Sequence, residues 1–445
     1  MRRLLTCLVA AAAAFGGLAT NAAAATASDG ASGTFNVLSY NVAGLPESLS
    51  SAPTPRASST TAIGSRIGGY DVVNVQEDFN YHAYLYAADT HPYRTPTSGG
   101  AGIGSGLNTL SDIPYDTDDF ERARWNSCQL DSGDCLTPKG FTFMRERLAE
   151  GVYVDFYNLH TNAGTNDGDL ASRADNLSQL TAFIKTHSAG NAVVVMGDTN
   201  TRYTRSGDTI AEFARDNGLT DAWVQLVRGG TPPAKGSDAL VCDENAITNS
   251  CEVVDKILYR GNKLVSLKAT AYNNEHAKFL TDDGLMLSDH DPITASFSWT
   301  RNPDLQLSDQ FGGPHGDYFT DVATVPAGAR PVTLSLRSGA RVDSVGVTLA
   351  DGTALTHGGT GGTASTLTLG SGEYVTSAQL CQGEKDGHTR IFYAKFTTNL
   401  GRALAGGSTT SDCVTRTAPS GWQLAGFHGR AGDELDKLGF VYTRR

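Results

Sequence analysis

The first two thirds of the chain carry the hydrophobic pattern of a mixed α/β fold. Four apolar runs rich in Val, Leu, Phe and Tyr end on a polar residue, which is typical of strands buried in a sheet; they span 35–41, 72–77, 152–160 and 192–198. Two segments have helical spacing: 171–187 gathers its apolar residues on one face, and 208–217 starts at Asp208 and stops before Gly218. Because Asp favours the N-terminal cap of a helix and Gly the C-terminal one, both ends of the second helix are predicted.

The pattern changes near residues 299–303, so we predict a boundary between two domains there. From Leu305 onward the chain has short β-type runs broken by Gly and Thr and almost no helical spacing. A chain of 445 residues also exceeds what one hydrophobic core usually holds. Charge divides at the same point, since residues 26–300 hold 34 acidic and 20 basic residues whereas 301–445 hold 13 of each. Metal ligands are one explanation for the acidic first part.

Residues 1–25 have the features of a secretory signal peptide. Arg2 and Arg3 precede an Ala-rich apolar stretch, and the small residues at 22–25 suit cleavage. That stretch is too short to span a membrane, and no later run reaches the roughly 20 apolar residues that a span needs. We therefore expect a secreted protein without a transmembrane segment. Exported proteins favour disulfides, and proximity favours the pairs Cys128–Cys135, Cys242–Cys251 and Cys381–Cys413, although other pairings stay open.

Polar side chains able to bind a metal or transfer a proton stand at the ends of the predicted strands. They are Asn41, Glu77, His160 and Asp198, with Asn200 two residues after the last. If the strands lie side by side, their ends meet at one rim of a sheet. Two later segments suit the same rim: Asp255 lies in the apolar run 252–258, and Asp289 and His290 precede a final strand. An unpaired acid in an apolar strand is costly, so Asp255 is expected to have a functional partner.

These residue types suit metal-assisted hydrolysis of a phosphoester. Carboxylate and amide oxygens bind hard cations, so we expect Mg²⁺ or another divalent cation such as Ca²⁺ or Mn²⁺. Such an ion offsets the charge that develops on the phosphate, and an imidazole can take a proton from the attacking water. The net charge of −12 disfavours general binding to polyanions but leaves a nuclease open.

Six short motifs occur in the order found in the endonuclease/exonuclease/phosphatase superfamily. They are Ser39-Tyr40-Asn41, Gln76-Glu77, Asn158-Leu159-His160, Gly197-Asp198-Thr199-Asn200, Val254-Asp255-Lys256-Ile257 and Ser288-Asp289-His290. The resemblance covers about residues 34–298 and implies a catalytic domain over 34–299. The implied fold is an α+β four-layer sandwich, in which two β-sheets are flanked by helices.

The resemblance also implies a role for each matched residue. Metal binding falls to Asn41, Glu77 and Asp289. Asp198 and Asn200 would contact the phosphate and orient the nucleophilic water, and His160 would stabilise or protonate the leaving group. His290 would be the general base, with Asp255 orienting its ring. Three further residues are candidates for contact with the phosphate, but we expect ordinary structural roles for them: Lys139, Arg173 and Asn162.

Three features favour the sphingomyelinase-like branch of this superfamily over its nucleases. The stretch 128–141 and the helix after His160 resemble the corresponding segments of bacterial neutral sphingomyelinases. Secretion and an acidic first domain also suit a lipid headgroup better than DNA. The membrane-inserting aromatic hairpin that some sphingomyelinases carry before the last motif is not evident in the polar segment 272–286. A secreted deoxyribonuclease I-like nuclease is the alternative.

Residues 304–443 resemble the jacalin-related lectins, which implies an all-β prism that binds a sugar. The matching stretches are 311–321, 342–347 and 424–442. In that family a Gly near the start and a GxxxD loop near the end form the sugar site, which here implies Gly312, Gly432 and Asp436. We therefore expect a secreted phosphodiesterase whose partners are a phospholipid headgroup, or second a nucleic acid, and a glycosylated surface. A sugar-binding protein without catalysis is the least favoured hypothesis, because the catalytic motifs are intact.

Overall fold

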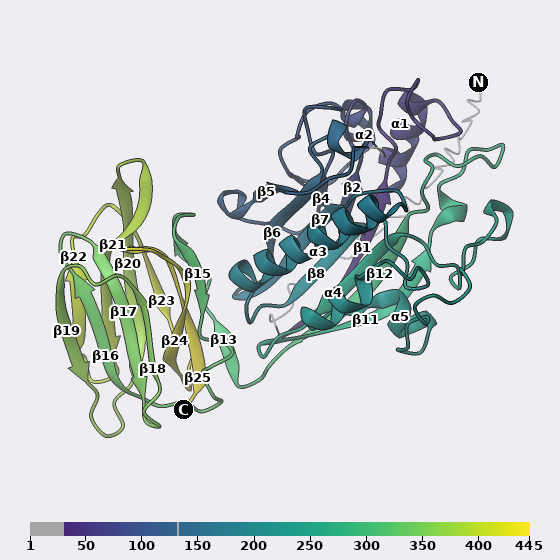
Figure 1. Ribbon diagram of the computed structural model, residues 1–445. Helices are drawn as coiled ribbons and strands as arrows, with labels where there is room; N and C mark the ends of the chain where they lie inside the picture. Colours follow the sequence, from purple (N-terminus) through teal and green to yellow (C-terminus); the bar gives the residue numbers. More distant parts are fainter. Residues whose placement is uncertain (1–30, 131–132) are drawn as a thin grey trace, which may run out of the picture.

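The protein is described by a computed structural model that covers residues 31–130 and 133–445. The predicted signal peptide, residues 1–25, lies outside the described residues. Two six-stranded sheets pack face to face in the first part of the chain, and helices cover their outer faces (Figure 1). From residue 305 onward the chain forms strands without helices, arranged in three sheets. The predicted fold, a four-layer sandwich followed by an all-β prism, is confirmed.

The first sheet of the sandwich has the strand order β11-β12-β1-β2-β4-β3. Its strands are Ser32–Asn41 (β1), Val72–Gln76 (β2), Tyr93–Arg94 (β3), Asn108–Ser111 (β4), Val265–Asn274 (β11) and Ile293–Arg301 (β12). β1 and β2 run parallel with Asn41 opposite Gln76, so both strands end at the same edge of the sheet. The helices α1 (Arg56–Arg66) and α2 (His82–Ala88) follow these two strands.

The second sheet has the order β5-β6-β7-β8-β10-β9. Its strands are Glu121–Arg124 (β5), Gly140–Ala149 (β6), Val152–His160 (β7), Val193–Asp198 (β8), Thr220–Asp221 (β9) and Asp255–Arg260 (β10). The helices α3 (Asp167–His187), α4 (Ile210–Asp216) and α5 (Ala222–Val227) belong to this half. His160 on parallel β7 and Asp255 on antiparallel β10 both lie opposite Asp198 of β8. The register alone therefore gathers three predicted site residues.

The predicted strands agree with β1, β2, β7 and β8 to within a few residues. The predicted start of the second helix is wrong, because α4 begins at Ile210 and Asp208 does not cap it. The Asp208 carboxylate instead accepts hydrogen bonds from Nε and Nη2 of Arg173, at 2.9 and 2.7 Å. Since the Arg173 guanidinium is buried, it needs a carboxylate partner. The predicted end is confirmed, since Gly218 has a φ of +63° just after the helix.

The C-terminal part consists of three sheets with the orders β13-β25-β24-β15, β18-β17-β16-β19 and β22-β21-β20-β23, and β14 pairs with β25. The strands are Leu305–Leu307 (β13), Phe311–Gly312 (β14), Asp317–Thr320 (β15), Pro331–Ser338 (β16), Val342–Leu349 (β17), Ala354–Gly358 (β18), Thr363–Thr368 (β19), Val375–Lys385 (β20), His388–Thr398 (β21), Ala403–Gly407 (β22), Asp412–Thr417 (β23), Trp422–Ala431 (β24) and Leu435–Arg444 (β25). All three predicted disulfides are present.

The two halves of the chain share a buried interface. One apolar core runs from the space between the sandwich sheets into the prism. The guanidinium of Arg145 on β6 lies 4.8 Å from the ring centre of Tyr318 on β15, and Arg147 forms an ion pair of 2.9 Å with Asp309. Arg145 and Arg147 lie opposite Asp155 and Tyr153 in the first half of β7, whereas His160 ends that strand. At about 3.3 Å per residue, the five residues from Asp155 to His160 place the nearer of these contacts roughly 17 Å from the site.

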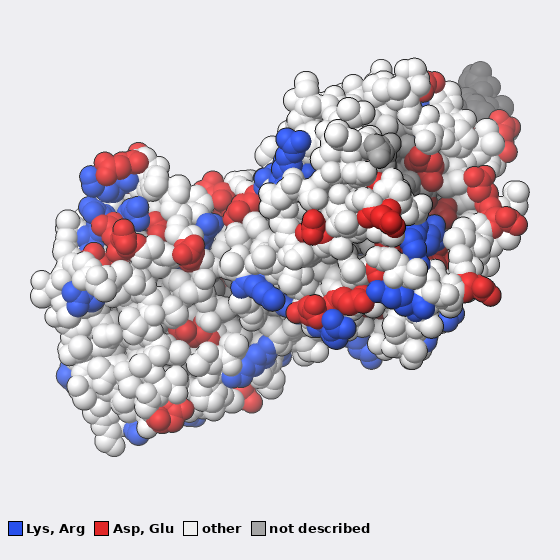
Figure 2. Space-filling view, in the orientation of Figure 1, with Lys and Arg blue, Asp and Glu red and all other residues white. Residues whose placement is uncertain are grey.

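Charge is spread unevenly over the surface. In Figure 2 the upper part of the sandwich, where α1 and α2 lie in Figure 1, is largely without charged side chains. Charged side chains of both signs gather instead at the upper end of the prism. Among the described residues, no helix is both long and apolar enough to cross a bilayer.

Candidate active site

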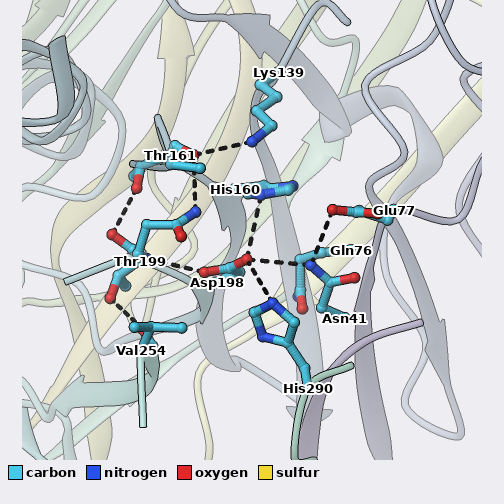
Figure 3. A network of polar contacts seen from close by, with 12 residues as sticks. Asn41, Gln76, Glu77, Lys139, His160, Thr161, Asp198, Thr199, Val254 and His290 are labelled. Atoms are coloured by element: carbon cyan, nitrogen blue, oxygen red, sulfur yellow. Dashed lines mark hydrogen bonds and ion pairs between the residues drawn. The ribbon is translucent and has the colours of Figure 1, made fainter. Parts of the chain in front are cut away.

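Asn41 and Glu77 lie side by side where β1 and β2 end (Figure 3). Nδ2 of Asn41 donates to Oε1 of Glu77 at 3.3 Å and to Oδ2 of Asp198 at 3.2 Å. The φ of Glu77 is +56°, a left-handed conformation that is unfavourable for a residue other than Gly. Gly44 holds this turn, because its backbone N donates to the Glu77 carbonyl at 3.0 Å. The strained backbone directs the Glu77 carboxylate toward the second sheet.

Asp198, at the end of β8, is the centre of the polar network in Figure 3. Its Oδ2 lies 3.2 Å from Nε2 of His160 and 3.7 Å from Nε2 of His290. Its Oδ1 accepts a hydrogen bond of 2.9 Å from the backbone N of Asn200. Burial by itself raises the pKa of a carboxyl, but the charge of His290 and the other neighbours outweighs it and lowers the pKa of Asp198 to about 2. Asp198 is therefore ionised at neutral pH.

Asp255 and His290 form a close pair next to Asp198. Nδ1 of His290 lies 2.9 Å from Oδ2 of Asp255, whose side chain is buried. Burial raises the pKa of Asp255 to about 6 although His290 acts against it. Burial also acts to lower the pKa of His290, but the carboxylates of Asp255 and Asp198 outweigh burial, so this pKa lies well above its ordinary value. The pair holds the imidazole in one orientation with Nε2 toward Asp198.

His160 is buried on the other side of Asp198. Burial and the nearby charge of Lys139 lower the pKa of His160 to about 3, so its ring is neutral. Its Nδ1 is buried and has no hydrogen-bond partner in the part of the chain that the structure describes. Asn200 has a φ of +49°, and its Nδ2 donates to the carbonyl of Thr161 at 3.2 Å. His160 and Asn200 thus enclose the Asp198 carboxylate from two sides.

The residues predicted to bind metal are only partly brought together. Glu77 and Asn41 are in contact, whereas the Asp289 side chain is exposed and has no hydrogen bond to either of them among the described residues. Asp289 is linked to Asn41 only through the Ser288 hydroxyl, which donates to the Asp289 carboxylate at 3.4 Å and to the Asn41 carbonyl at 2.6 Å. The amide nitrogen of Asn41 lies between the carboxylates of Glu77 and Asp198, so this place attracts positive charge. A cation there requires Asn41 to turn its oxygen inward. With that rotation, the carboxylate and amide oxygens fit a hard divalent ion.

A second group of possible ligand atoms overlaps with the catalytic residues. One atom from each of Asp198, Asp255 and His290 lies within 4.8 Å of the others. The ring nitrogen that faces Asp255 is already engaged with that carboxylate. This geometry suits proton transfer better than metal binding, because the imidazole and the carboxylate already satisfy each other.

Lys139 is closer to the site than the sequence analysis expected. It forms an ion pair with Asp134 of the disulfide-closed loop, and its Nζ lies 3.5 Å from the carbonyl of Thr161 (Figure 3). Its charge lowers the pKa of His160 and acts against the burial that raises the pKa of Glu77. A Lys held at the mouth of an anionic site is placed to contact a phosphate. Arg173 and Asn162, in contrast, are buried and bonded within the protein.

Arg56 is a residue that the sequence analysis missed. It is fully buried at the start of α1, and its guanidinium donates to the carbonyls of Val42 and Ala43 at 3.1 and 3.0 Å. A further bond of 2.7 Å reaches the carbonyl of Leu287, just before Asp289 and His290. Arg56 therefore ties the segment after Asn41 to the segment that carries His290. An Arg that follows a Pro at the first turn of a helix carries no local signal of such a role.

Two of the residues predicted to bind sugar, Gly312 and Asp436, are in contact. Gly312 packs so closely on Asp436 that an added Cβ would lie 2.1 Å from the Asp436 carbonyl oxygen. The backbone N of Gly313 donates to the same oxygen at 2.8 Å. The Asp436 side chain is buried, its Oδ1 accepts a bond of 2.9 Å from Arg390, and burial raises its pKa. Gly432 lies in the hairpin between β24 and β25, four residues before Asp436.

Family models match both parts of the chain. Residues 57–243 match endonuclease/exonuclease/phosphatase family 2, and residues 308–441 match the jacalin-like lectin domain. The chain therefore carries an endonuclease/exonuclease/phosphatase domain and a C-terminal jacalin-like lectin domain. The two family resemblances stated in the sequence analysis are thus confirmed. We call the two parts the phosphatase-family domain and the lectin domain.

Individual relatives match the two domains separately. The phosphatase-family domain is similar to a sphingomyelinase of Mycobacterium tuberculosis, with 43% identity over 284 residues that cover 62% of this chain and 55% of the relative. The chain thus spans about half the length of the curated relatives that it matches first. The lectin domain is similar to horcolin of Hordeum vulgare, with 33% identity over 137 residues that cover 29% of this chain and 92% of horcolin. A solved structure of sphingomyelinase C from Streptomyces griseocarneus is 18% identical, covers 59% of this chain and 99% of its own, and has a TM-score of 0.39.

Proposed function

We propose that the chain is a secreted, divalent-metal-dependent phosphodiesterase of the sphingomyelinase type, which its lectin domain holds at glycosylated surfaces. The observation that carries the proposal is the line of Asp255, His290 and Asp198 at the meeting edge of the two sheets. An oriented imidazole between two buried carboxylates is suited to proton transfer, and a purely structural role would rarely require this arrangement.

His290 is the general base in this proposal. The carboxylate of Asp255 accepts a hydrogen bond from Nδ1. Because the pKa of His290 is raised, the ring acts as a base only after it has lost its Nε2 proton, and Nε2 then takes a proton from water. Asp255 also stabilises the imidazolium that results. Asp198 lies 3.7 Å from Nε2 and accepts a hydrogen bond from the backbone N of Asn200, and these two residues orient the attacking water against the phosphorus. The buried negative charge of Asp198 keeps the ring turned toward the reacting atoms.

His160 and Lys139 lie on the other side of Asp198 and serve the leaving group and the phosphate. His160 is neutral and faces Asp198 through Nε2, so it is placed to donate a hydrogen bond as negative charge develops on the leaving oxygen. Lys139 supplies a positive charge to the phosphate oxygens from the mouth of the site. In this proposal the leaving group therefore lies on the side of Asp198 opposite to the general base, His290.

Glu77, with Asn41 turned so that its oxygen faces inward, would hold a divalent cation such as Mg²⁺. When bound, the cation offsets the negative charge that develops on the phosphate. Asp289 is exposed near this place, and we keep it as an outer ligand that acts only after a change in its side-chain position. Glu77 is therefore the residue on which the metal assignment depends.

Two observations favour a phospholipid headgroup over a nucleic acid. The relative that matches the phosphatase-family domain at 43% identity is named a sphingomyelinase. In addition, the loops beside the site present little positive charge, whereas a polyanionic strand needs a basic track along its path (Figure 2). We propose that the lectin domain binds a sugar through the loops of Gly312 and Gly432, with Asp436 as the carboxylate.

A substrate panel tests this proposal. The purified protein is assayed with Mg²⁺ or Ca²⁺ and with an EDTA control against sphingomyelin, other phospholipids, plasmid DNA, RNA and inositol phosphates. The His290→Ala variant, purified in the same way, shows whether any activity comes from the protein itself. Hydrolysis of sphingomyelin that EDTA abolishes supports the proposal. Nicking of plasmid DNA with inert lipids would assign the chain to the nuclease branch instead.

A further inference from the structure

Large apolar side chains project into solvent from the loops around the candidate active site. Three of them stand on different loops: Leu49 is 68% exposed, Ile103 80% and Leu136 73%. Leu130, in the same disulfide-closed loop as Leu136, is 74% exposed. We call these four side chains the apolar rim. Single exposed apolar residues are common on soluble proteins, but a group on one edge needs an explanation.

The loops of the apolar rim form one continuous ridge. The backbone N of Asn80 donates to the Gly44 carbonyl at 3.1 Å, which joins the Leu49 loop to the segment after Glu77. The Asn80 side chain accepts a bond of 3.3 Å from Ala101 in the Ile103 loop. A Cβ added to Gly102 would lie 3.7 Å from the Leu136 carbonyl oxygen, so the Ile103 and Leu136 loops also touch.

The ridge belongs to the wall of the site. At the base of the Ile103 loop, Gly106 packs on Glu77, and an added Cβ there would lie 3.0 Å from the Glu77 Cα. The carbonyl of Gly106 also accepts a hydrogen bond of 2.9 Å from the backbone N of Asp78. Leu136 precedes Lys139 by three residues, and Lys139 reaches into the site. A substrate that enters between Glu77 and Lys139 must therefore pass these apolar side chains.

The ridge is also poor in charge. The described residues of the three loops 44–54, 98–106 and 127–137 include only two charged side chains, Glu47 and the buried Asp134, which pairs with Lys139. The upper part of the phosphatase-family domain in Figure 2 is accordingly almost white. A surface this poor in charge suits a zwitterionic lipid bilayer, whereas a protein or nucleic acid partner is usually matched by charge.

We propose that the apolar rim is the surface by which this protein contacts a phospholipid bilayer, inserting Ile103 and Leu136 among the lipids beside the substrate. The proposal rests on the proposed lipid substrate and adds the surface that reaches it. Segment 272–286 has no aromatic hairpin that could contact the bilayer, and the proposal assigns that contact to the Leu49, Ile103 and Leu136 loops instead. That segment instead carries the exposed acids Asp282 and Asp283.

Binding to vesicles in EDTA tests the rim apart from hydrolysis. The vesicles contain phosphatidylcholine and sphingomyelin but no glycolipid, so the lectin domain has no ligand there. Wild type is compared with the double variant Ile103→Ser/Leu136→Ser by cosedimentation. Each side chain withdrawn from lipid is expected to weaken binding about tenfold, so the double variant should bind roughly a hundredfold more weakly. Leu400→Ser, 64% exposed on the lectin domain, is the matched control and should bind like wild type.

Three results would overturn the proposal: wild type that does not bind these vesicles, a double variant that binds them equally well, or equal weakening by Leu400→Ser. A change in oligomeric state without a change in vesicle binding would show that the rim contacts a second copy, which also overturns it. Ile103→Trp gives a direct readout, since its fluorescence should shift to the blue and be quenched by brominated lipids.

Hydrolysis distinguishes failure of the rim from failure of the proposed function. Neither rim residue touches the catalytic side chains, so the double variant should cleave a water-soluble phosphorylcholine diester within about twofold of wild type while its rate on vesicles falls with binding. Normal binding without cleavage of sphingomyelin would support the rim and remove the proposed substrate. Normal cleavage of sphingomyelin vesicles by the double variant would support the substrate and remove the rim.

Discussion

Replacing Asp119 with Asn should loosen the contact between the two domains and leave catalysis unchanged. Asp119 ends a short 3-10 helix, Thr117–Asp119, and is only 2% exposed. Its carboxylate accepts two bonds of 3.1 Å from Nζ of Lys437 and one of 3.1 Å from Nη1 of Arg430. Both cations belong to the lectin domain. Asn keeps the size of the side chain but removes the charge that these buried cations face.

The expected magnitude follows from which contacts remain. Removing one partner of a buried ion pair costs about 3–5 kcal/mol. Lys437 keeps its bond of 2.7 Å to Asp116, so we expect the lower end of that range, about 3 kcal/mol. Denaturant unfolding, followed together with limited proteolysis, measures the loss. The exposed neighbour Asp118 is the matched control, and Asp118→Asn should change stability by less than about 0.5 kcal/mol.

The pH dependence gives a second measurement of the same carboxylate. Burial raises the pKa of Asp119, but the charges of Lys437 and Arg145 outweigh burial, so this pKa lies below its ordinary value. Such a carboxyl stabilises the folded protein above its unfolded pKa, and the contribution is lost as the pH falls through the folded pKa. Wild type should therefore lose more stability than Asp119→Asn below about pH 4. The reasoning would be refuted if Asp119→Asn lowered the free energy of unfolding by less than about 1 kcal/mol at neutral pH. It would also be refuted if wild type and Asp119→Asn lost stability equally as the pH falls.

Four further predictions concern the remaining sites. Glu77→Gln should reduce turnover to near background, with little rescue by added Mg²⁺; near-normal rates would remove Glu77 from the metal site. His290→Ala should lose about 10²–10⁴-fold in rate. Asp255→Asn should lose less, because the His290 imidazole remains in that variant. Equal rates in His290→Ala and wild type at matched metal and pH would exclude His290 from the mechanism. Asp436→Ala should abolish binding on a glycan array while turnover of a soluble substrate stays normal, and retained glycan binding would contradict the assigned sugar site. Burial acts to lower the pKa of His91, but its contacts with the Asp89 carboxylate and with the Tyr70 carbonyl, at 2.6 Å, outweigh burial and raise this pKa. Wild type should therefore lose folding stability as the pH rises through the raised pKa, and His91→Gln should not show that loss.

Much of the candidate site was predictable because strand ends are positions that a sequence reveals. A buried apolar run that stops at a polar residue marks the edge of a sheet, and parallel neighbours end at the same edge. Hence Asn41 and Glu77 meet, and so do His160 and Asp198. Asp255 was also recognisable, since an acid in an apolar run needs a partner, and the structure pairs it with His290 at 2.9 Å. The catalytic roles of these residues stay predictions.

The remaining features depend on contacts between distant segments, for which a sequence gives no local pattern. Asp208 has the composition of a helix cap, yet its carboxylate pairs with Arg173 from another helix. Arg56 reaches the Leu287 carbonyl 231 residues away, and Asp119 meets Lys437 across 318 residues. Asp289 shares a tripeptide with His290, but the turn that directs His290 inward leaves Asp289 exposed.

The interface around Asp119 also sets how the two domains act together. Its contacts flank the loop of Asp436, because Arg430 and Lys437 lie on the strands before and after that hairpin and Arg430 also donates to the Gly316 carbonyl at 3.1 Å. The proposed sugar loops are therefore fixed to the phosphatase-family domain by the same carboxylate. Because the contacts of Arg145 and Arg147 with the lectin domain lie toward the start of β7 and the candidate catalytic side chains lie at its end, the proposed mechanism needs no group from the lectin domain. If the lectin domain binds sugar as proposed, a rigid connection of this kind would raise the local concentration of the active site at a glycosylated membrane, through fixed geometry rather than a flexible tether. Loosening the interface through Asp119→Asn should consequently lower the rate on glycolipid-containing vesicles and leave the rate on a soluble diester unchanged.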